Sequence, residues 1–389
     1  MNTRPAIESS SYPVALSASF NQDASCFSVG LNSGFCIFNS DPCQLRVSRD
    51  FNAGVGEVQM LGKANFIALI GGGKQPKFPQ NRVIIWDDAK QRVAIQLPVL
   101  TSVRGVRLSR THVLVALQNS VRVYTFSSPP ELWSDFETAD NPLGLCCLTS
   151  STIAFPGRTP GQVQLVELAT GNVSIIPAHG SSLQALDISR DGELLATASE
   201  TGTLVRIFST SNCARLAELR RGVDHATIYS LAISPSGQLL AVTSDKSTLH
   251  IFDIPHPSKP PRTETPNGHR RMTSMGSGGS SPGINDIDAS QKWGILGRIP
   301  LLPRVFSDVY SFASAHFEIG DEPLPGSPGS NSVSTTRPPK GVIGWTSDSS
   351  IIVIGAGRDG RWEKFVIADG EDGKRYCVRD GWKRYLGVS

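Results

Sequence analysis

The sequence lacks the features that mark membrane-spanning, secreted or polyanion-binding proteins. It has no run of the roughly 18 apolar residues that a membrane-spanning helix needs. Its first residues, MNTRPAIESSSYPV, contain no apolar stretch of the signal-peptide type. Lys and Arg number 37 against 34 Asp and Glu, a formal net charge of +3, so any anion site must be local. We therefore expect a soluble, cytoplasmic chain whose contact with membranes, if it has any, is peripheral.

The cysteines carry no metal or disulfide signal. There are seven, an odd number, and no C-x-x-C pair occurs. Several stand in apolar runs such as GLCCL (144–148), which is typical of small buried hydrophobic residues in a reducing compartment. A zinc site would need paired Cys and His spacing. The sequence predicts no metal and no cofactor.

Long segments with helical periodicity are nearly absent, and one short β-rich motif recurs instead. The steps between the last residues of its first six copies are 48, 38, 42, 42 and 44, and a weaker seventh copy ends 113 residues after the sixth. The copies are FCIF (35–38), VIIW (83–86), VRVY (121–124), VQLV (163–166), VRIF (205–208), LHIF (249–252) and WEKF (362–365). Polar turns such as SRDG (189–192) separate the strands.

A period of about 40 to 45 residues is the signature of a β-propeller, in which each repeat is a four-stranded blade. The dipeptide in WDD (86–88) has the structural WD form of such repeats. We predict an all-β fold: residues 1–389 form one seven-bladed propeller of the WD-repeat type. Closing the ring removes most exposed strand edges.

The gap between the sixth and seventh copies is too long for one blade. Residues 255–290, rich in Pro, Ser, Gly and basic residues, are predicted to form a mobile loop inserted in blade six. Residues 321–340 are predicted to be a flexible link between blades six and seven. The end of the stretch between them, RVFSDVYSFASAHF (304–317), alternates and is expected to supply the missing fourth strand of blade six.

No pattern in the chain indicates catalysis. GGGKQ (71–75) follows a strand, but a phosphate-binding loop of the P-loop type needs Ser or Thr after the lysine and a helix behind it. His and Asp residues are scattered singly, and no Ser-His-Asp or Cys-His group can be argued from spacing. We predict a protein that is not an enzyme and that binds neither nucleic acid nor a small-molecule substrate.

Two adjacent arginines, Arg220 and Arg221, stand at the predicted rim of the ring, followed by Gly222. Successive side chains of a strand point to opposite faces, so the two cations must serve two crevices, one towards blade five and one towards blade six. Donor-rich turns, SETGT (199–203) and SDKST (244–248), lie in both repeats, and arginine grips phosphate bidentately. The alternative is that the arginines pair with Glu218 and Asp224 or are merely solvated.

Four stretches match one known family: LRRG (219–222), FNQDASCF (20–27), LLATASETGTLVRIF (194–208) and SDKSTLHIF (244–252). Through them nearly the whole chain resembles the PROPPINs, the WIPI-type seven-bladed phosphoinositide-binding propellers. LRRG is a variant of their FRRG motif, typical of a fungal-like sub-branch. The resemblance implies two headgroup sites. Site one would contain Arg220, His179, Ser181, Ser199, Thr201, Thr203 and Arg206; site two would contain Arg221, His225, Ser244, Lys246, Thr248 and His250.

The resemblance also implies a function. The chain would bind phosphatidylinositol 3-phosphate and the 3,5-bisphosphate on vacuolar, endosomal and pre-autophagosomal membranes, acting in autophagy and membrane traffic. Trp293, Ile295 and Leu296 in the blade-six insertion would enter the bilayer, unless they pack on blade six. A large autophagy lipid-transfer protein would be the partner, touching Asn21 and Asp23, unless those are ordinary turn residues. The alternative function is a protein-assembly scaffold that binds no lipid.

Overall fold

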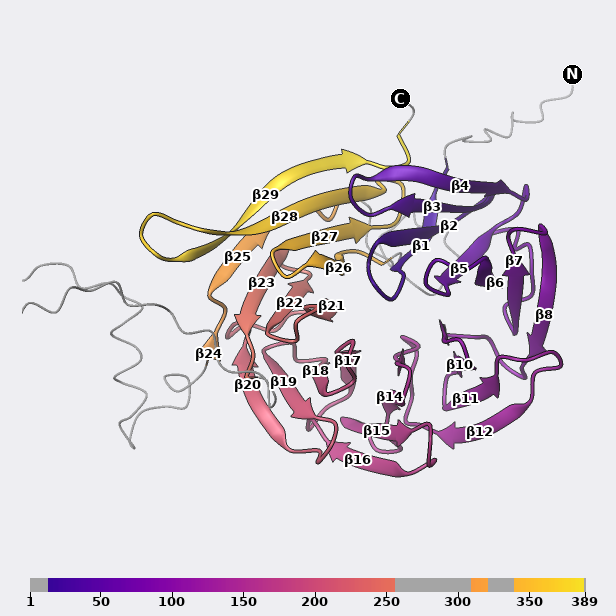
Figure 1. Cartoon of the computed structure of the whole chain (residues 1–389), viewed down its shortest axis with the longest axis horizontal. Helices are drawn as coiled ribbons and strands as arrows, with labels where there is room; N and C mark the ends of the chain where they lie inside the picture. The colour runs from indigo at the N-terminus through magenta and orange to yellow at the C-terminus, as the bar shows by residue number, and fades with distance from the viewer. Residues whose placement is uncertain (1–12, 256–308, 321–338, 388–389) are drawn as a thin grey trace, which may run out of the picture.

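The computed structural model describes residues 13–255, 309–320 and 339–387. Within these ranges the chain forms seven antiparallel sheets arranged as blades around a ring (Figure 1). The seven-bladed all-β propeller predicted from the repeats is therefore confirmed. Each of the seven recurring motifs lies in the third strand of its blade. The described ranges contain no helix long and apolar enough to cross a membrane.

The strands follow one another blade by blade. Blades one to four are β1 (Ala15–Phe20), β2 (Cys26–Leu31), β3 (Gly34–Asn39), β4 (Gln44–Asp50); β5 (Val55–Met60), β6 (Phe66–Gly71), β7 (Arg82–Asp87), β8 (Arg92–Pro98); β9 (Gly105–Leu108), β10 (His112–Ala116), β11 (Ser120–Thr125), β12 (Leu132–Glu137); β13 (Cys147–Leu148), β14 (Thr152–Pro156), β15 (Gln162–Glu167), β16 (Val173–Pro177). Blades five to seven are β17 (Leu183–Ile188), β18 (Leu194–Ser199), β19 (Leu204–Ser209), β20 (Arg215–Arg220); β21 (Ile228–Ile233), β22 (Leu239–Ser244), β23 (Thr248–Asp253), β25 (Ala313–His316); β26 (Val342–Ser347), β27 (Ser350–Gly355), β28 (Arg361–Asp369), β29 (Arg375–Arg384).

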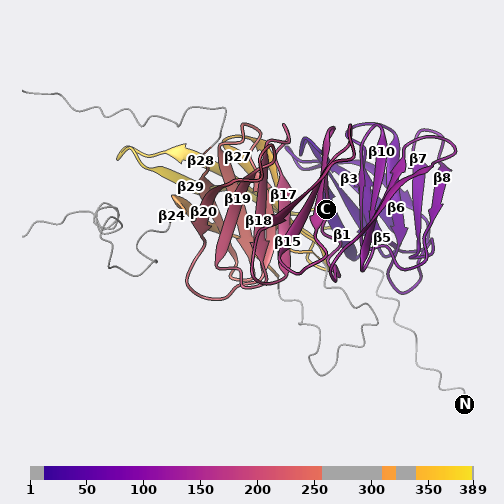
Figure 2. The ribbon, with the colours of Figure 1, turned by 90° about the horizontal axis from the view of Figure 1, so that it is seen from below.

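The first strand of each blade lies near the axis and the fourth at the rim, which the side view shows as a flat disc of upright strands (Figure 2). The second strands are buried on both faces because neighbouring blades pack against them, so they read as continuous apolar runs, whereas third strands such as β19 and β23 also carry half-buried polar residues. One cluster between blades five and six, for example, joins Val205 and Leu219 to Val242 and Phe252.

Blades seven and one close the ring without exchanging a strand. Ala15 and Gly357 exchange two backbone hydrogen bonds of 3.0 and 2.8 Å. Trp362 Nε1 of blade seven donates to the Ser40 carbonyl of blade one at 2.8 Å, and Lys364 Nζ lies 2.9 Å from Asp41 Oδ2. Polar contacts and a packed cluster that includes Phe27 of blade one and Ile352 of blade seven, rather than a shared sheet, therefore join the two blades.

Blade six departs from the regular plan. Its fourth strand, β25 (Ala313–His316), pairs with β23, as the alternation of residues 304–317 predicts, but it is shorter than that stretch. β24 (Val309–Tyr310) pairs instead, in parallel, with β20 of blade five. The parallel pairing arises because the chain re-enters at the rim beside blade five before it reaches blade six. The predicted loop 255–290 and link 321–340 lie almost wholly outside the described residues, and their expected mobility remains a prediction.

Candidate phosphate-binding rim

Arg220 and Arg221 emerge on opposite faces of blade five, at the end of its outer strand. Arg220 pairs with Leu204 in the ladder, and the amide of Arg221 continues it with a bond of 3.0 Å to the Thr203 carbonyl. Leu219 between blades five and six fixes the orientation, since its side chain is buried against blade six. Arg220 therefore points into the crevice between blades four and five, and Arg221 into the crevice between blades five and six.

The crevice between blades four and five brings together the residues expected in site one. His179 lies in the connection from β16 to β17, with its Nε2 3.0 Å from Thr197 Oγ1. Ser199 and Thr201 lie at the β18–β19 turn, with their hydroxyl oxygens 2.9 Å apart. Ser181 and Thr203 are both half-buried nearby along the chain. The turn is tight because Gly202 has a φ of +63°, and a Cβ there would lie 1.7 Å from the Ala226 carbonyl oxygen.

Arg206, also expected in site one, is bonded to protein groups in this structure. Its Nε donates to Glu218 Oε2 at 2.8 Å, and its Nη1 donates to the Ala178 carbonyl at 2.6 Å. These bonds occupy much of the guanidinium's donor capacity and tie blade five to the β16–β17 connection. Arg206 thus lines the same crevice as His179, whose pKa its charge helps to lower. Glu218, which the alternative reading paired with Arg220, accepts from Arg206 and, at 3.0 Å, from Arg215.

The crevice between blades five and six is organised around Arg221, which is 8% exposed. Its Nε donates to the Gly202 carbonyl at 2.7 Å, and its Nη2 donates to the Asp224 carbonyl. Burial lowers the pKa of Arg221, which the carboxylates of Asp245 and Asp224 partly oppose. These carboxylates act through space, while the direct bonds are to backbone oxygens. Through these bonds Arg221 stabilises the base of the crevice, in addition to any part it has in binding a ligand.

The other residues expected in site two lie around this crevice. His250 faces blade five from β23, and Thr248 lies two residues earlier on the same face. Thr248 Oγ1 is buried and has no hydrogen-bond partner among the described residues. Ser244 is fully buried at the end of β22, and Lys246 is exposed on the turn that follows. His225 is exposed in the connection between blades five and six.

Both histidines are held neutral by their surroundings. Burial, and then the positive charge of Arg206, lowers the pKa of His179 to about 4. Burial, and then the charges of Arg221 and His316, lowers the pKa of His250 to about 4. At neutral pH each imidazole therefore has one N–H donor and one acceptor nitrogen. Each can donate a hydrogen bond to a phosphate oxygen without bringing a second charge into the crevice.

We expect these histidines to make the fold sensitive to acid. In the unfolded chain they protonate near pH 6.5, and in the fold only near pH 4. The unfolded state thus binds more protons in this window, so the free energy of unfolding falls as the pH drops from about 6.5 to about 4. Urea denaturation across this range will show the decline, and H179Q and H250Q will each flatten it. Unchanged slopes in both variants would contradict the assignment.

Three residues of the crevices were missed from the sequence. Thr197 contacts His179 but looks like an ordinary member of the apolar strand LLATAS; its place two residues before Ser199, on the same face, was the available signal. Ser311 Oγ lies 3.0 Å from His250 Nδ1, and His316 is the ladder partner of Thr248. Ser311 and His316 reach site two only because the chain returns to it after some 50 residues, which local spacing cannot reveal.

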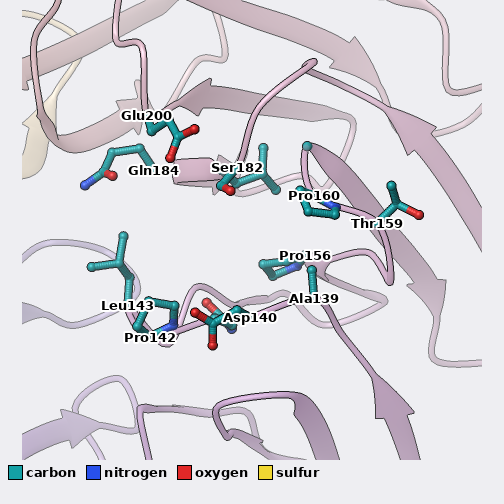
Figure 3. A pocket seen from close by; sticks show the side chains of 13 residues that line it. Ala139, Asp140, Pro142, Leu143, Pro156, Thr159, Pro160, Ser182, Gln184 and Glu200 are labelled. Atoms are coloured by element: carbon teal, nitrogen blue, oxygen red, sulfur yellow. The ribbon is translucent and has the colours of Figure 1, made fainter.

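A pocket of about 300 Å³ lies next to site one, towards the axis, and is unsuited to phosphate (Figure 3). Glu200 and Asp140 lie on opposite sides of it, and Pro142, Leu143 and Pro156 line the side on which Asp140 lies. Two carboxylates repel an anionic headgroup. This pocket is therefore a poorer candidate for a phosphate site than the crevices at Arg220 and Arg221.

The remaining predicted residues stand apart from the rim crevices. Asn21 is 4% exposed and bonds to Ser25, Cys26 and the Gly62 carbonyl, so it shapes the β1–β2 turn. Asp23 is exposed on that turn and lies 3.8 Å from Lys63. Trp293, Ile295 and Leu296 lie outside the described residues. Among the described residues, no group of three or more His, Cys, Asp or Glu side chains could hold a metal ion.

Comparisons with known proteins agree on one family. The sequence model of the PROPPIN family matches residues 15–277. The SVP1-like protein 2 of Emericella nidulans is 62% identical over 330 residues, which cover 84% of this chain and 99% of that protein. The SVP1-like protein 2 of Saccharomyces cerevisiae is 34% identical over 95% of this chain and 90% of its own. The crystal structure of Kluyveromyces marxianus Hsv2 shares the fold, with a TM-score of 0.71 at 22% identity over 97% of this chain and 100% of that chain. The chain is a member of the PROPPIN family.

Proposed function

We propose that this protein is a peripheral membrane effector that binds phosphatidylinositol 3-phosphate and the 3,5-bisphosphate through two headgroup sites on its rim. The observation that carries the proposal is the divergence of Arg220 and Arg221 into two crevices, each with its own neutral histidine and hydroxyl donors. Inositol phosphates offer mainly acceptors at neutral pH, and these crevices offer mainly donors. Membership of the PROPPIN family supports the same ligand class.

Two sites on one rim suit a membrane better than a soluble ligand. A second headgroup in the same bilayer is bound at a high effective concentration, so two weak sites act together. In this proposal Trp293, Ile295 and Leu296 supply the additional apolar contact that stable peripheral anchoring requires. The membranes would be the vacuolar, endosomal and pre-autophagosomal ones, where the protein would act in autophagy and membrane traffic.

The proposal includes recruitment of a protein partner by a different surface. Asp23 lies on the β1–β2 turn of blade one, whereas Arg220 and Arg221 lie at the outer end of β20 in blade five (Figure 1). A structure similar in fold, with a TM-score of 0.61, is described as a complex of KlAtg21 with the coiled coil of AgAtg16. We propose an autophagy protein as the partner here, with a large lipid-transfer protein as the specific class expected from the family.

Vesicle flotation separates the lipid-binding proposal from a scaffold that binds only proteins. We expect the protein to float with vesicles that contain about 5% phosphatidylinositol 3-phosphate and to remain at the bottom with vesicles of phosphatidylcholine alone. Rising salt will weaken binding by screening the exposed charges of the rim. Equal flotation with both vesicles, or none with either, would reject the proposed function.

A further inference from the structure

A short segment, residues 309–312, crosses the outer mouth of the crevice between blades five and six. At one end β24 pairs with β20, with Tyr310 opposite Arg220. At the other end the amide of Phe312 donates to the Ile251 carbonyl of β23 at 3.0 Å. Ser311 lies between these anchors, and its hydroxyl is 3.0 Å from His250 Nδ1. The position of this crossing segment therefore decides where the imidazole of His250 is held.

Arg375 holds the crossing segment from blade seven. Its guanidinium carbon lies 3.7 Å from the centre of the Phe312 ring, a cation–π contact. The same guanidinium bonds both oxygens of Asp253, the last residue of β23, with one N···O distance of 2.9 Å. The Arg375 side chain thus joins the end of β23, at Asp253, to Phe312 of the crossing segment. A planar cation is needed for this double contact, because it stacks on a ring and forks onto a carboxylate at once.

Arg375 is itself held in place by a long hairpin. β28 and β29 pair from Arg361↔Arg384 to Asp369↔Arg375, and the hairpin reaches outward past β25 (Figure 1). Its tip is closed by a bond of 2.7 Å from the Gly370 amide to the Lys374 carbonyl. Tyr376 Oη donates to Asp372 Oδ2 at 2.6 Å. The β28–β29 hairpin therefore fixes the position of the Arg375 guanidinium beside blade six.

We propose that Arg375 is a positioning residue for the second headgroup site, acting through Phe312 and Ser311 on His250. The inference rests on the proposed function, since it assigns a support to one of the two proposed sites. Arg375 contacts Phe312 and Asp253, and through them it acts on the crossing segment. Its loss would free the crossing segment, and His250 would lose the hydroxyl partner that orients its ring.

The test uses full-length protein and soluble dibutanoyl phosphatidylinositol 3-phosphate, measured by calorimetry. In an R220T background, where only the second site remains, R375A should weaken binding about fivefold. In an R221T background, where only the first site remains, R375A should have no effect. R375K keeps the charge but loses the bidentate bond to Asp253 and the stacking on Phe312. Its loss of affinity should therefore be smaller than that of R375A. R379A is the matched control, because Arg379 lies on the same strand and pairs with Glu363 at 3.0 Å.

The His250 imidazole gives a readout that does not depend on lipid. Its NMR titration in R375A should shift towards higher pH, because its ring becomes more exposed, while that of His179 stays in place. If R220T binds no headgroup at all, the proposed function fails, yet the titration still tests Arg375. If R375A changes neither the affinity in the R220T background nor the His250 titration, the positioning role is wrong.

Discussion

Replacing both Arg220 and Arg221 by threonine will lower binding to vesicles containing phosphatidylinositol 3-phosphate by at least about 100-fold. In the proposed sites each arginine supplies charge-assisted hydrogen bonds to a phosphate, worth about 1.5–3 kcal/mol each. Losing both sites also removes the advantage of binding two lipids in one bilayer. Flotation or surface plasmon resonance on supported bilayers will measure the loss.

The two arginines will differ in their effect on stability. Arg221 is buried and donates to the Gly202 and Asp224 carbonyls, so R221T will cost about 1–3 kcal/mol by leaving them without these bonds. R220T will change the free energy of unfolding much less, since Arg220 is only half-buried. R215T is the control, because Arg215 lies on the same strand and is 48% exposed. Full vesicle binding by a folded double variant would overturn the proposed sites.

Replacing Trp345 by alanine will destabilise the propeller by about 3–5 kcal/mol, the usual cost of removing a buried aromatic side chain. Trp345 is 2% exposed, and its ring is packed between blades six and seven. Its Nε1 also donates to the Ala232 carbonyl of blade six at 2.9 Å, a bond that alanine cannot replace. Calorimetry should show a Tm lower by roughly 10 °C.

Trp382 provides the matched control on the same blade. It is 53% exposed on β29, where Arg361 lies over its ring at 4.4 Å. Such an exposed contact is worth about 0.5–1 kcal/mol, so W382A should lower the Tm by no more than a few degrees. Equal losses in the two variants would show that the seam between blades six and seven does not carry the stability assigned to it.

The fold was predictable because each blade of a propeller repeats the same pattern of strands and turns in the sequence. Each third strand carries apolar residues that pack between blades, so the recurring runs VRIF (205–208) and LHIF (249–252) mark their blades in the sequence. The divergence of Arg220 and Arg221 followed in the same way from strand alternation alone. The sequence did not show that Arg220 faces blade four, because that depends on how neighbouring blades pack.

The parts that escaped prediction depend on contacts distant in the sequence. The sequence did not show that Arg206 donates to its ladder partner Glu218. Ser311 and β24 reach blade five only after the long insertion. Thr197 was overlooked in the apolar strand LLATAS, although its spacing of two residues from Ser199 was an available signal. Spacing along the chain does not reveal that Ser311 and β24 return to these blades.

The most direct test of the two-site account is the number of soluble headgroups that one chain binds. Titration calorimetry with dibutanoyl phosphatidylinositol 3-phosphate should give two equivalents for the unaltered protein and one for each of R220T and R221T, with folding checked by circular dichroism. A single equivalent for the unaltered protein, lost completely in either variant, would mean that both cations serve one ligand, and the account would be wrong.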